Sequence, residues 1–196
     1  MVLLSETGEP VGHQLKATVH HADTPLHLAF SIFLFDGAGR TLFQQRAFHK
    51  PTWPGVWSNA CCGHPAPGES LIGAARRRLR HELGITAAFD LELALPTFRY
   101  RARWGDLWEN EVCPVFVGTY GGPLAPNPDE VAAVRWIWWS AFARECRSDA
   151  PSEFDAFSPW SRWEAAELLA LPHFAALTTS SQIARATSAM TRSRSS

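Results

Sequence analysis

The first half of the chain carries two apolar runs with a short polar break between them. Residues 28–35 (LAFSIFLF) and 40–46 (RTLFQQR) flank the sequence DGAG at 36–39. Two such runs joined by a short Gly-containing loop are typical of a β-hairpin. Further strands are predicted at 97–103, 111–119 and 133–139.

Residues 69–83 (ESLIGAARRRLRHEL) have the periodicity of one helix that ends at Gly84, a residue type common just after helix C-termini. At about 100° per residue, the apolar side chains form one stripe. Arg78 and Glu82 lie on an overlapping stripe and therefore border the side that faces the core. The apolar stripe contains Ile72, Ala75, Leu79 and Leu83.

The remaining segments complete an α/β fold of the α+β kind. Two more helices are predicted, one near 140–147 and one that starts at Ser158-Pro159, where Ser caps and Pro occupies the first turn. Residues 47–68 lack periodicity and are rich in Pro, Gly, Trp, Cys and His, which favours a functional loop. Strands mixed with a few helices predict a mixed β-sheet sandwiched between α-helices. We expect one domain over 1–177 and a flexible Ser/Thr/Arg-rich tail over 178–196.

Composition narrows the class of protein. The 196 residues include 46% hydrophobic residues, enough for a packed core, and the net charge of -1 gives no reason to expect nucleic-acid or membrane-surface binding. The start MVLLSETGEP is too acidic for a signal peptide, and no apolar run approaches the ~20 residues of a membrane span. We therefore expect a cytoplasmic protein with free thiols. The nine tryptophans and twelve phenylalanines predict a large aromatic core, an aromatic-walled pocket, or both.

The segment from Gly63 to Ile85 resembles the Nudix box, Gly-x5-Glu-x7-Arg-Glu-U-x-Glu-Glu-x-Gly-U, in which U is aliphatic. In Nudix hydrolases this helix presents several carboxylates that hold Mg²⁺ on a diphosphate. Here Arg78 and His81 replace two of those carboxylates, and Glu82 remains. Because Mg²⁺ prefers oxygen ligands, the hydrolytic metal site is depleted, whereas a guanidinium suits direct phosphate binding.

Three other segments concentrate metal-binding side chains. They are the histidine-containing stretch 20–30, the triplet Cys62-Gly63-His64, and Glu109 with Glu111. Alternate residues of a strand face the same side, so both carboxylates can point into one pocket. Three imidazoles with one or two carboxylates suit Zn²⁺ or Mn²⁺. A single histidine is more often structural or exposed, but three such segments in one small domain favour a site.

Together these motifs resemble type I isopentenyl diphosphate isomerases, over about Leu15 to Trp160. The segments that carry the resemblance are HADTPLHLAF, WPGVWSN, CCGHP with GES, FRYRA, ENEVCPVF and AFSPW. The resemblance implies a Nudix-like fold and the interconversion of isopentenyl diphosphate and dimethylallyl diphosphate, which supplies isoprenoid biosynthesis. The implied partner is a small-molecule diphosphate, with no flavin, no nucleic acid and no membrane, and the protein is expected to be a monomer or weak homodimer.

The resemblance also implies the metal site. In the family a divalent ion, here expected to be Mn²⁺ or Zn²⁺, occupies a site of three histidines and two glutamates. His20 is preferred to its neighbour His21 because it stands seven residues before His27, as the family pattern does, but His21 remains an alternative. The implied ligands are His20, His27, His64, Glu109 and Glu111.

The catalytic and substrate-binding residues follow in the same way. Cys62 matches the family's catalytic cysteine, Glu111 its catalytic glutamate and Tyr100 the tyrosine that assists it. Glu82 matches a residue that helps to hold Mg²⁺ with the substrate diphosphate. Trp160 matches an aromatic residue at the hydrocarbon end of the pocket, with core packing as an equal alternative. The matched diphosphate-binding positions are Lys16, Arg46, Lys50 and Arg78, each of which by itself would pass as a solvated charge.

The implied chemistry adds a proton at C4 of an unactivated double bond and removes one from C2, through a tertiary carbocation. Cys62 and Glu111 are therefore expected on opposite faces of one apolar, water-free pocket. Two rival functions remain, a Nudix diphosphohydrolase of nucleoside diphosphate derivatives and a metal-binding or regulatory module without catalysis. The replaced carboxylates argue against the first, and the retained Cys62, Glu111 and Tyr100 against the second. Cys61, Cys113 and Cys146 are expected to be ordinary structural residues.

Overall fold

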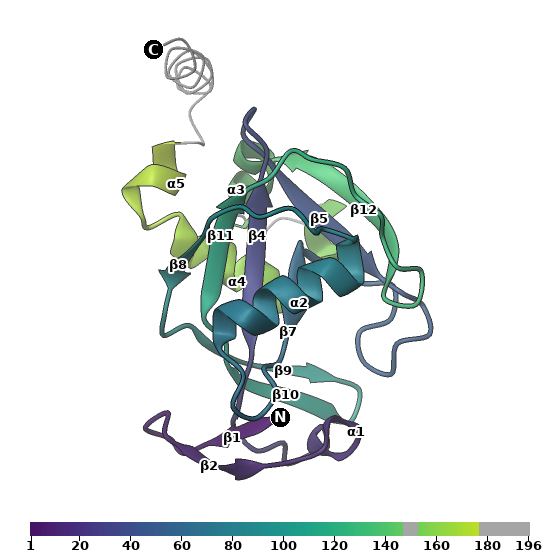
Figure 1. Ribbon diagram of the computed structural model, residues 1–196, viewed down its shortest axis with the longest axis vertical. Coiled ribbons are helices and arrows are strands. Elements are labelled where there is room, and N and C mark those ends of the chain that lie inside the picture. Colours follow the sequence, from purple (N-terminus) through teal and green to yellow (C-terminus); the bar gives the residue numbers. More distant parts are fainter. Residues whose placement is uncertain (147–152, 177–196) are drawn as a thin grey trace.

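A seven-stranded mixed sheet forms the centre of the protein (Figure 1). The computed structural model describes residues 1–146 and 153–176, so the predicted tail over 178–196 lies outside the described residues. The strand order is β12-β5-β4-β11-β8, with β6 paired to β5 and β7 paired to β4. Only the β4–β11 pair is parallel among these pairings. The strands are β4 (Phe30–Phe35), β5 (Arg40–Arg46), β6 (Trp57–Asn59), β7 (Cys61–Gly63), β8 (Leu91–Leu95), β11 (Val115–Thr119) and β12 (Val131–Trp138).

A smaller five-stranded sheet lies at one end of the central sheet, with the order β2-β1-β3-β10-β9. The chain passes between the sheets three times, from β3 to β4 through Ala29, from β8 to β9 through residues 96–98, and from β10 to β11 through Cys113-Pro114. The first and third passages run side by side, because Ala29 N donates to Val112 O and Ser31 N donates to Pro114 O. The strands are β1 (Val2–Leu4), β2 (Pro10–His13), β3 (His27–Leu28), β9 (Arg99–Trp104) and β10 (Leu107–Val112).

The single strand predicted over 111–119 is therefore wrong, because it is divided between the two sheets. Pro114 has no N–H to donate to a ladder, so regular pairing stops there and resumes at Val115. This break matters for the site, because it sets the end of β10 beside β3 at the joint between the sheets.

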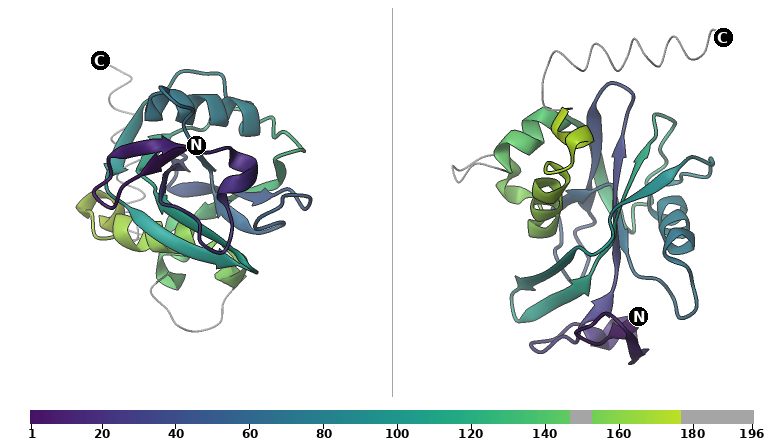
Figure 2. Two further views of the ribbon diagram at one scale, coloured as in Figure 1. Left: turned by 90° about the horizontal axis from the view of Figure 1, so that it is seen from below. Right: turned by 90° about the vertical axis from the view of Figure 1, so that its left-hand side faces the viewer.

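Helices cover both faces of the central sheet, as the sequence predicted (Figure 2). Helix α2 lies on one face, and α3, α4 and α5 lie on the other. A short helix α1 and a 3₁₀ turn complete the described part. The bounds are α1 (Lys16–Val19), α2 (Leu71–Leu83), α3 (Trp139–Glu145), the 3₁₀ turn (Glu153–Ala156), α4 (Pro159–Leu168) and α5 (Pro172–Ala176). None of these described helices is long and apolar enough to span a membrane.

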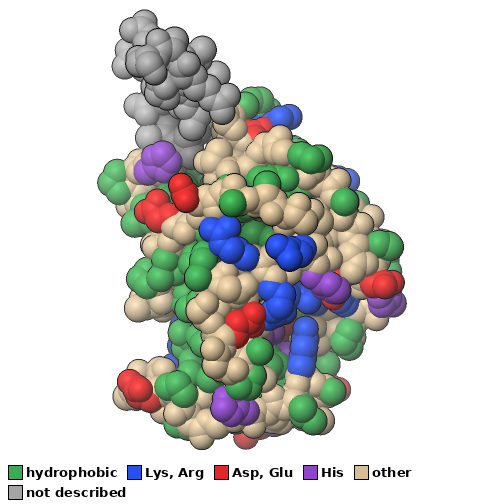
Figure 3. All heavy atoms as spheres, viewed as in Figure 1, with side chains coloured by type: hydrophobic (Ala, Val, Ile, Leu, Met, Phe, Trp, Pro, Cys, Tyr) green, Lys and Arg blue, Asp and Glu red, His purple; other side chains and the backbone are tan. Residues whose placement is uncertain are grey.

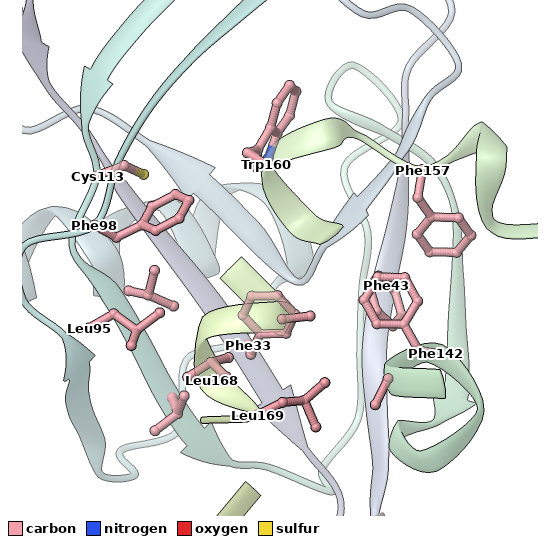
Figure 4. Close-up of a cluster of buried hydrophobic side chains, with 14 of the residues drawn as sticks. Phe33, Phe43, Leu95, Phe98, Cys113, Phe142, Phe157, Trp160, Leu168 and Leu169 are labelled. Carbon is pink, nitrogen blue, oxygen red and sulfur yellow. The ribbon is translucent and has the colours of Figure 1, made fainter. Parts of the chain in front are cut away.

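Strand β4 is buried along its whole length and separates two apolar clusters. Phe30, Ile32 and Leu34 pack with α2, whereas Phe33 and Phe35 face the helices opposite. This alternation follows from the two-residue period of a strand. The second cluster is mainly aromatic, and Figure 4 shows Phe33 at its centre, with Trp160, Phe98 and Cys113 at the upper end of the view.

Helix α2 begins two residues later than predicted and ends at the expected place. Ser70 is its N-cap and accepts a hydrogen bond from Gly73 N, while Glu69 stays outside and pairs with Arg77. Gly84 ends the helix in the left-handed conformation (φ 68°), where a side chain would meet Ala125. The capping therefore fixes which residues of α2 face the sheet.

The predicted loop over 47–68 contains two short strands, so that expectation is wrong in part. Strand β6 pairs with β5, and β7 pairs with β4 through Ser31 opposite Cys62. Three-residue strands rich in Cys, Ser and Gly have no visible period, because their partners rather than their own pattern hold them. All four cysteines are free thiols, and Cys61 and Cys113 are buried as expected, whereas Cys146 is half-buried.

Candidate active site and metal centre

Four of the five predicted metal ligands converge where the two sheets meet. His20 directly follows α1, His27 and Glu111 lie opposite each other on β3 and β10, and His64 directly follows β7. One donor atom from each of these residues lies within 4.8 Å of the other three. Parallel pairing of β3 with β10 brings together His27 and Glu111, which are far apart in the chain.

The contacts within this cluster fit a metal ion. His27 Nδ1 lies 2.9 Å from Pro25 O, and since a carbonyl only accepts, this nitrogen carries a ring hydrogen. His27 Nε2 lies 3.2 Å from Glu111 Oε1, and His64 Nε2 lies 3.0 Å from the same oxygen. His20 Nε2 and His64 Nδ1 are buried without a hydrogen-bond partner. A cation would bind one nitrogen of each ring, so it would satisfy His20 Nε2 and take the place of a proton between His27 Nε2 and Glu111, while the Pro25 carbonyl orients the His27 ring.

The protonation states also suit metal ligation. Burial lowers the pKa of His20 to about 4, and burial lowers the pKa of His64 as well. Burial acts to raise the pKa of Glu111, but the neighbouring His64 and His27 outweigh it and hold that pKa well below its usual range. Burial acts to lower the pKa of His27 too, but its hydrogen bond to Glu111 outweighs burial and raises that pKa, so His27 would release a proton on binding a cation. Neutral His20 and His64 beside an ionised carboxylate are forms that bind a divalent cation.

Glu109 lies outside the four-residue group and is joined to it through Tyr100. The Tyr100 hydroxyl is 3.0 Å from Glu109 Oε2 and 2.9 Å from Glu111 Oε2. One hydroxyl hydrogen can serve only one of these oxygens fully at a time. Burial, followed by the charge of Glu111, raises the pKa of Glu109 to about 8. Both carboxylates thus face one side of β10, as alternation predicted, and they share a single donor.

Cys62 lies on β7, and serine hydroxyl groups lie close to its thiol. Its thiol donates to Asn59 Oδ1 at 3.1 Å and lies 3.2 Å from Ser31 Oγ. Burial, followed by the charge of Glu164, raises the pKa of Cys62 to about 12, so the thiol is uncharged near neutral pH. Burial raises the pKa of Tyr100 well above its usual range, and the charges of Glu109 and Glu111, then of Cys113 and Cys62, raise it further.

Trp160 closes the same space from α4. Its ring stacks on Tyr100 with centroids 5.7 Å apart and planes at 24°. Its indole N–H donates to Ser58 Oγ at 3.2 Å, and Ser58 Oγ lies 3.8 Å from the Cys62 thiol. Trp160 is also buried in the aromatic cluster. The core-packing interpretation of this residue is therefore confirmed, and its role as a wall of the substrate pocket stays a prediction.

Glu164 is a site residue that the sequence reasoning missed. It is fully buried, its Oε1 lies 4.0 Å from the Cys113 thiol, and its Oε2 has no hydrogen-bond partner. Burial raises the pKa of Glu164 well above its usual range, so the group is a neutral acid near neutral pH. The signal was present, because Glu164 lies four residues from both Trp160 and Leu168 on the buried stripe of α4.

The predicted diphosphate ligands form a separate cationic cluster. Arg78 and Lys50 meet at one carboxylate, that of Glu130. Burial lowers the pKa of Lys16, and the charges of Arg78, Lys50 and Arg46 lower it further. Figure 3 shows Lys and Arg side chains gathered on the face over α2. Glu130, which the sequence reasoning missed, binds Lys50 and lies 3.1 Å from Arg78 Nη2.

Glu82 belongs to this cationic cluster and not to the histidine group. Its Oε1 accepts from Arg78 Nε at 2.9 Å, and its Oε2 accepts from Gln44 Nε2 at 2.7 Å. The two clusters are neighbours, because the charge of Lys16 acts on the pKa of His20 and that of Arg46 on the pKa of Glu109. The arrangement combines a thiol, a carboxylate and a metal-binding group with an adjoining anion site.

Comparisons with known proteins agree with this geometry. The family described as NUDIX domain matches residues 25–160. An isopentenyl-diphosphate Delta-isomerase of Saccharopolyspora erythraea is 51% identical over 87% of this chain and 86% of its own length. One of Mycolicibacterium vanbaalenii is 53% identical over 82% of this chain and 86% of its own length.

The similarity of this chain to solved structures is a similarity of fold alone. The MutT protein of Methanosarcina mazei has a TM-score of 0.59 at 17% identity, and the match covers 74% of this chain and 93% of that one. The dihydroneopterin triphosphate pyrophosphohydrolase of E. coli has a TM-score of 0.53 at 17% identity, with the same coverage of 74% and 93%.

Proposed function

Because this chain belongs to the isopentenyl-diphosphate Delta-isomerase family and carries a NUDIX domain, we propose that it interconverts isopentenyl diphosphate and dimethylallyl diphosphate at the joint between its two sheets. The observation that supports the assignment of the site is that Trp160 links the two groups. Its indole N–H donates to Ser58 Oγ, which lies 3.8 Å from the Cys62 thiol, and its ring stacks on Tyr100, whose hydroxyl donates to Glu111. The isomerisation needs one proton donor and one proton acceptor around a flat alkene.

We propose that Cys62 and Glu111 are that pair. In the forward direction a proton is added at C4, the positive charge develops at the tertiary carbon C3, and a proton leaves C2. The double bond thereby moves from C3–C4 to C2–C3, and the reverse direction exchanges the two roles. The Tyr100 hydroxyl, 2.9 Å from Glu111 Oε2, orients this carboxylate and holds a hydrogen bond to it while it gains or loses a proton.

The apolar wall protects the cation. The face of an aromatic ring attracts a cation by about 1–2 kcal/mol or more when water is absent. The Trp160 ring lies against Tyr100 and close to the Cys62 surround, so it is placed to supply this attraction. Burial of the same groups excludes water, which would otherwise capture the cation as an alcohol.

Two cations are proposed to assist. Mn²⁺ or Zn²⁺ would be held by His20, His27, His64 and Glu111, with Glu109 as a fifth ligand once Tyr100 releases it, and would fix the position and proton affinity of Glu111. Mg²⁺ would bind with Glu82 and the substrate diphosphate. The donor set and the unpartnered His20 Nε2 support the first ion.

The diphosphate is proposed to occupy the cationic cluster. The charges of Arg78, Lys50 and Arg46 each lower the pKa of Lys16, and Glu130 pairs with Lys50 and Arg78 as a bound anion would. Binding the head group there supplies energy remote from the reacting carbons. The acid–base route needs no redox cofactor, so we propose no role for flavin.

The diphosphohydrolase alternative finds little support in α2. Of the carboxylates in the box-like segment, Glu69 is bound to Arg77 and to Ala66 N, and Glu82 is bound to Arg78. His81 contacts Glu130 instead of contributing a carboxylate. A Mg²⁺ cluster on this helix would lack most of its oxygen ligands.

We also propose that the protein acts in the cytoplasm as a monomer or weak homodimer on a small-molecule diphosphate, without nucleic acid or membrane. The free thiols and the near-neutral net charge support this proposal. Light scattering at several protein concentrations would measure the oligomeric state.

The deciding experiment follows isopentenyl diphosphate by NMR in D₂O, with added Mg²⁺ and Mn²⁺ and then with a chelator. We expect dimethylallyl diphosphate with deuterium in a methyl group, and loss of conversion after chelation. A panel of nucleoside diphosphate derivatives serves as the control. Phosphate release from that panel without any isomerisation would contradict the proposal and favour the hydrolase.

A further inference from the structure

Trp53 has a backbone conformation that is unfavourable for its residue type. Its φ is 53°, and among the described residues it is the one non-glycine residue with a positive φ. A Cβ atom makes this left-handed region costly, and such conformations persist where the surroundings impose them, often at ligand-binding positions. In the sequence this residue begins the motif WPGVWSN.

Arg46 imposes the conformation. Its side chain donates from Nε to Trp53 O at 3.2 Å and from Nη2 to Thr52 O at 3.0 Å. Its backbone also closes the other end of the same loop, because Arg46 N donates to Val56 O and Gly55 N donates to Arg46 O. A single arginine therefore clamps both ends of the loop that carries Trp53.

The indole of Trp53 faces the aromatic wall. It is 7% exposed and meets Trp160 edge to face, with centroids 5.1 Å apart and planes at 88°. On its other side it contacts Trp104 at 5.0 Å. Its Nε1 is buried without a hydrogen-bond partner. Buried hydrogen-bond donors normally have an acceptor. The unpartnered Trp53 Nε1 next to Trp160 therefore indicates a position beside a ligand or an ordered water.

The same clamp reaches the anion site. Arg46 uses only Nε and one hydrogen of Nη2 on the loop, so the rest of the guanidinium stays available for phosphate oxygens. Lys50, in the same loop, pairs with Glu130 and so belongs to the cationic cluster. One loop therefore links the residues for the diphosphate head to an aromatic ring against Trp160.

We propose that Trp53 is a positioning residue that closes the hydrocarbon chamber, and that Arg46 sets it in place from the diphosphate side. This inference rests on the proposed function and adds a specific task to it. Trp53 keeps water away from C3 while the positive charge is there. If the wall opens, water adds its oxygen to C3 and loses one proton to solvent or to the base. The product is then a tertiary alcohol diphosphate, which is isopentenyl diphosphate plus one water.

The test uses the full chain with Trp53→Gly, Trp53→Phe and the control Trp138→Phe, whose tryptophan is 47% exposed at the end of β12. Glycine suits the positive φ, so Trp53→Gly removes the ring without straining the loop. Products from isopentenyl diphosphate are quantified by NMR, together with kcat and KM. We expect Trp53→Gly to lower kcat about tenfold or more, with less change in KM, and to release the tertiary alcohol.

Arg46→Lys tests the clamp, because lysine keeps the charge but cannot hold both carbonyls from one planar group. We expect this variant to raise KM and also to release the alcohol, although every aromatic ring remains. A merely structural role for Trp53 would lower the folded fraction and leave the product ratio unchanged.

The outcomes separate this inference from the proposed function. Wild-type protein and Trp138→Phe must give dimethylallyl diphosphate without alcohol, and a wild type that does not isomerise overturns the proposed function itself. With an active wild type, a folded Trp53→Gly that keeps its kcat and releases no alcohol overturns the role of Trp53. If circular dichroism shows Trp53→Gly to be unfolded, Trp53→Phe decides, because we expect detectable alcohol from it and its absence would overturn the inference.

Discussion

The proposed reaction chamber, around Cys62, Tyr100 and Glu111, and the proposed diphosphate mouth, which is the cationic cluster around Arg78, are neighbours, but the charges of their side chains are set in opposite ways. In the chamber, Cys62, Tyr100 and Glu164 are uncharged because burial raises their pKa values. In the mouth, the groups keep their charges because they pair, as Arg78 does with Glu82 and Glu130. Burial therefore sets the chemistry of one region, and mutual charge compensation sets the affinity of the other.

This difference predicts a division of kinetic effects. Groups that act only on the reacting carbons contribute to the transition state, so their loss lowers kcat. Groups that hold the diphosphate bind substrate and transition state alike, so their loss raises KM. Substitutions in each region test whether kcat and KM respond separately.

The largest effect is expected for Cys62→Ala. The substitution removes the only thiol of the proposed acid–base pair, and general acid–base groups contribute about 10²–10⁴-fold. We expect isomerisation to fall about a thousandfold, with pyrophosphate binding by calorimetry within about twofold of wild type. Cys146→Ala, a half-buried thiol far along the chain, is the matched control. Activity of Cys62→Ala within a few-fold of wild type would defeat the assignment.

The second-largest effect is expected for loss of a metal ligand, as in His27→Ala. His27 is fully buried, and its loss leaves Glu111 with one imidazole fewer and a space in the cluster. We expect His27→Ala to lower activity about a hundredfold and to abolish the rise in Tm that Mn²⁺ or Zn²⁺ gives the wild type. His13→Ala, on an exposed strand, should behave as wild type in both assays. An unchanged metal-induced Tm shift in His27→Ala would contradict the proposed site.

These two regions also differ in how far the sequence predicted them. The capping and periodicity of α2 and α4 are local, so their positions were predicted to within two residues. The alternation that put Glu109 and Glu111 on one side of a strand is also local, and the structure agrees. The three histidines of the metal site were predicted from motif resemblance, and the fold brings their donor atoms to within 4.8 Å of one another.

Features that depend on distant partners could not be predicted. Strands β6 and β7 exist because β5 and β4 lie beside them, and their residues show no period. Glu130 resembles an ordinary acidic residue in a Pro-containing loop, and only the fold brings it to Arg78 and Lys50. The left-handed Trp53 depends on Arg46, seven residues away across the loop.

Tyr100→Phe tests whether the chamber needs its shared donor. The change deletes one oxygen and leaves two carboxylates without the hydroxyl between them. We expect kcat to fall about tenfold to a hundredfold with KM nearly unchanged. Tyr120→Phe is a close control, because the Tyr120 hydroxyl also donates a hydrogen bond, in this case to Pro123 O, but lies in the cluster packed against α2. Equal effects of the two changes would indicate a loss of packing rather than of catalysis.

Arg78→Lys tests the proposed diphosphate site. Arg78 bonds Glu82 from Nε and Nη2 and reaches Glu130 as well, which a lysine cannot do at once. We expect KM to rise about fivefold to tenfold and kcat to stay within about twofold. Arg80→Lys, exposed on the same helix, controls for the loss of a guanidinium. A fall in kcat at unchanged KM would break the proposed division between the regions.

The smallest effect is expected for Glu130→Gln, and it has opposite signs on affinity and stability. In the wild type, Lys50 and Arg78 hold the pKa of Glu130 at about 2 despite its partial burial. Because this pKa lies below the usual 4.5, the carboxylate stabilises the fold above pH 4.5, and that contribution is lost as the pH falls towards 2.

We expect the variant to unfold about 1–2 kcal/mol more easily at pH 7, after allowance for solvent screening, and the gap to narrow below pH 4.5 and close towards pH 2 in urea titrations. Its KM should fall about threefold, because the diphosphate no longer competes with an internal carboxylate for the two cations. Glu92→Gln, exposed on β8, should change neither quantity. A higher KM would mean that Glu130 contributes to binding the substrate or its Mg²⁺, so that charge compensation in the mouth persists in the complex instead of giving way to the diphosphate.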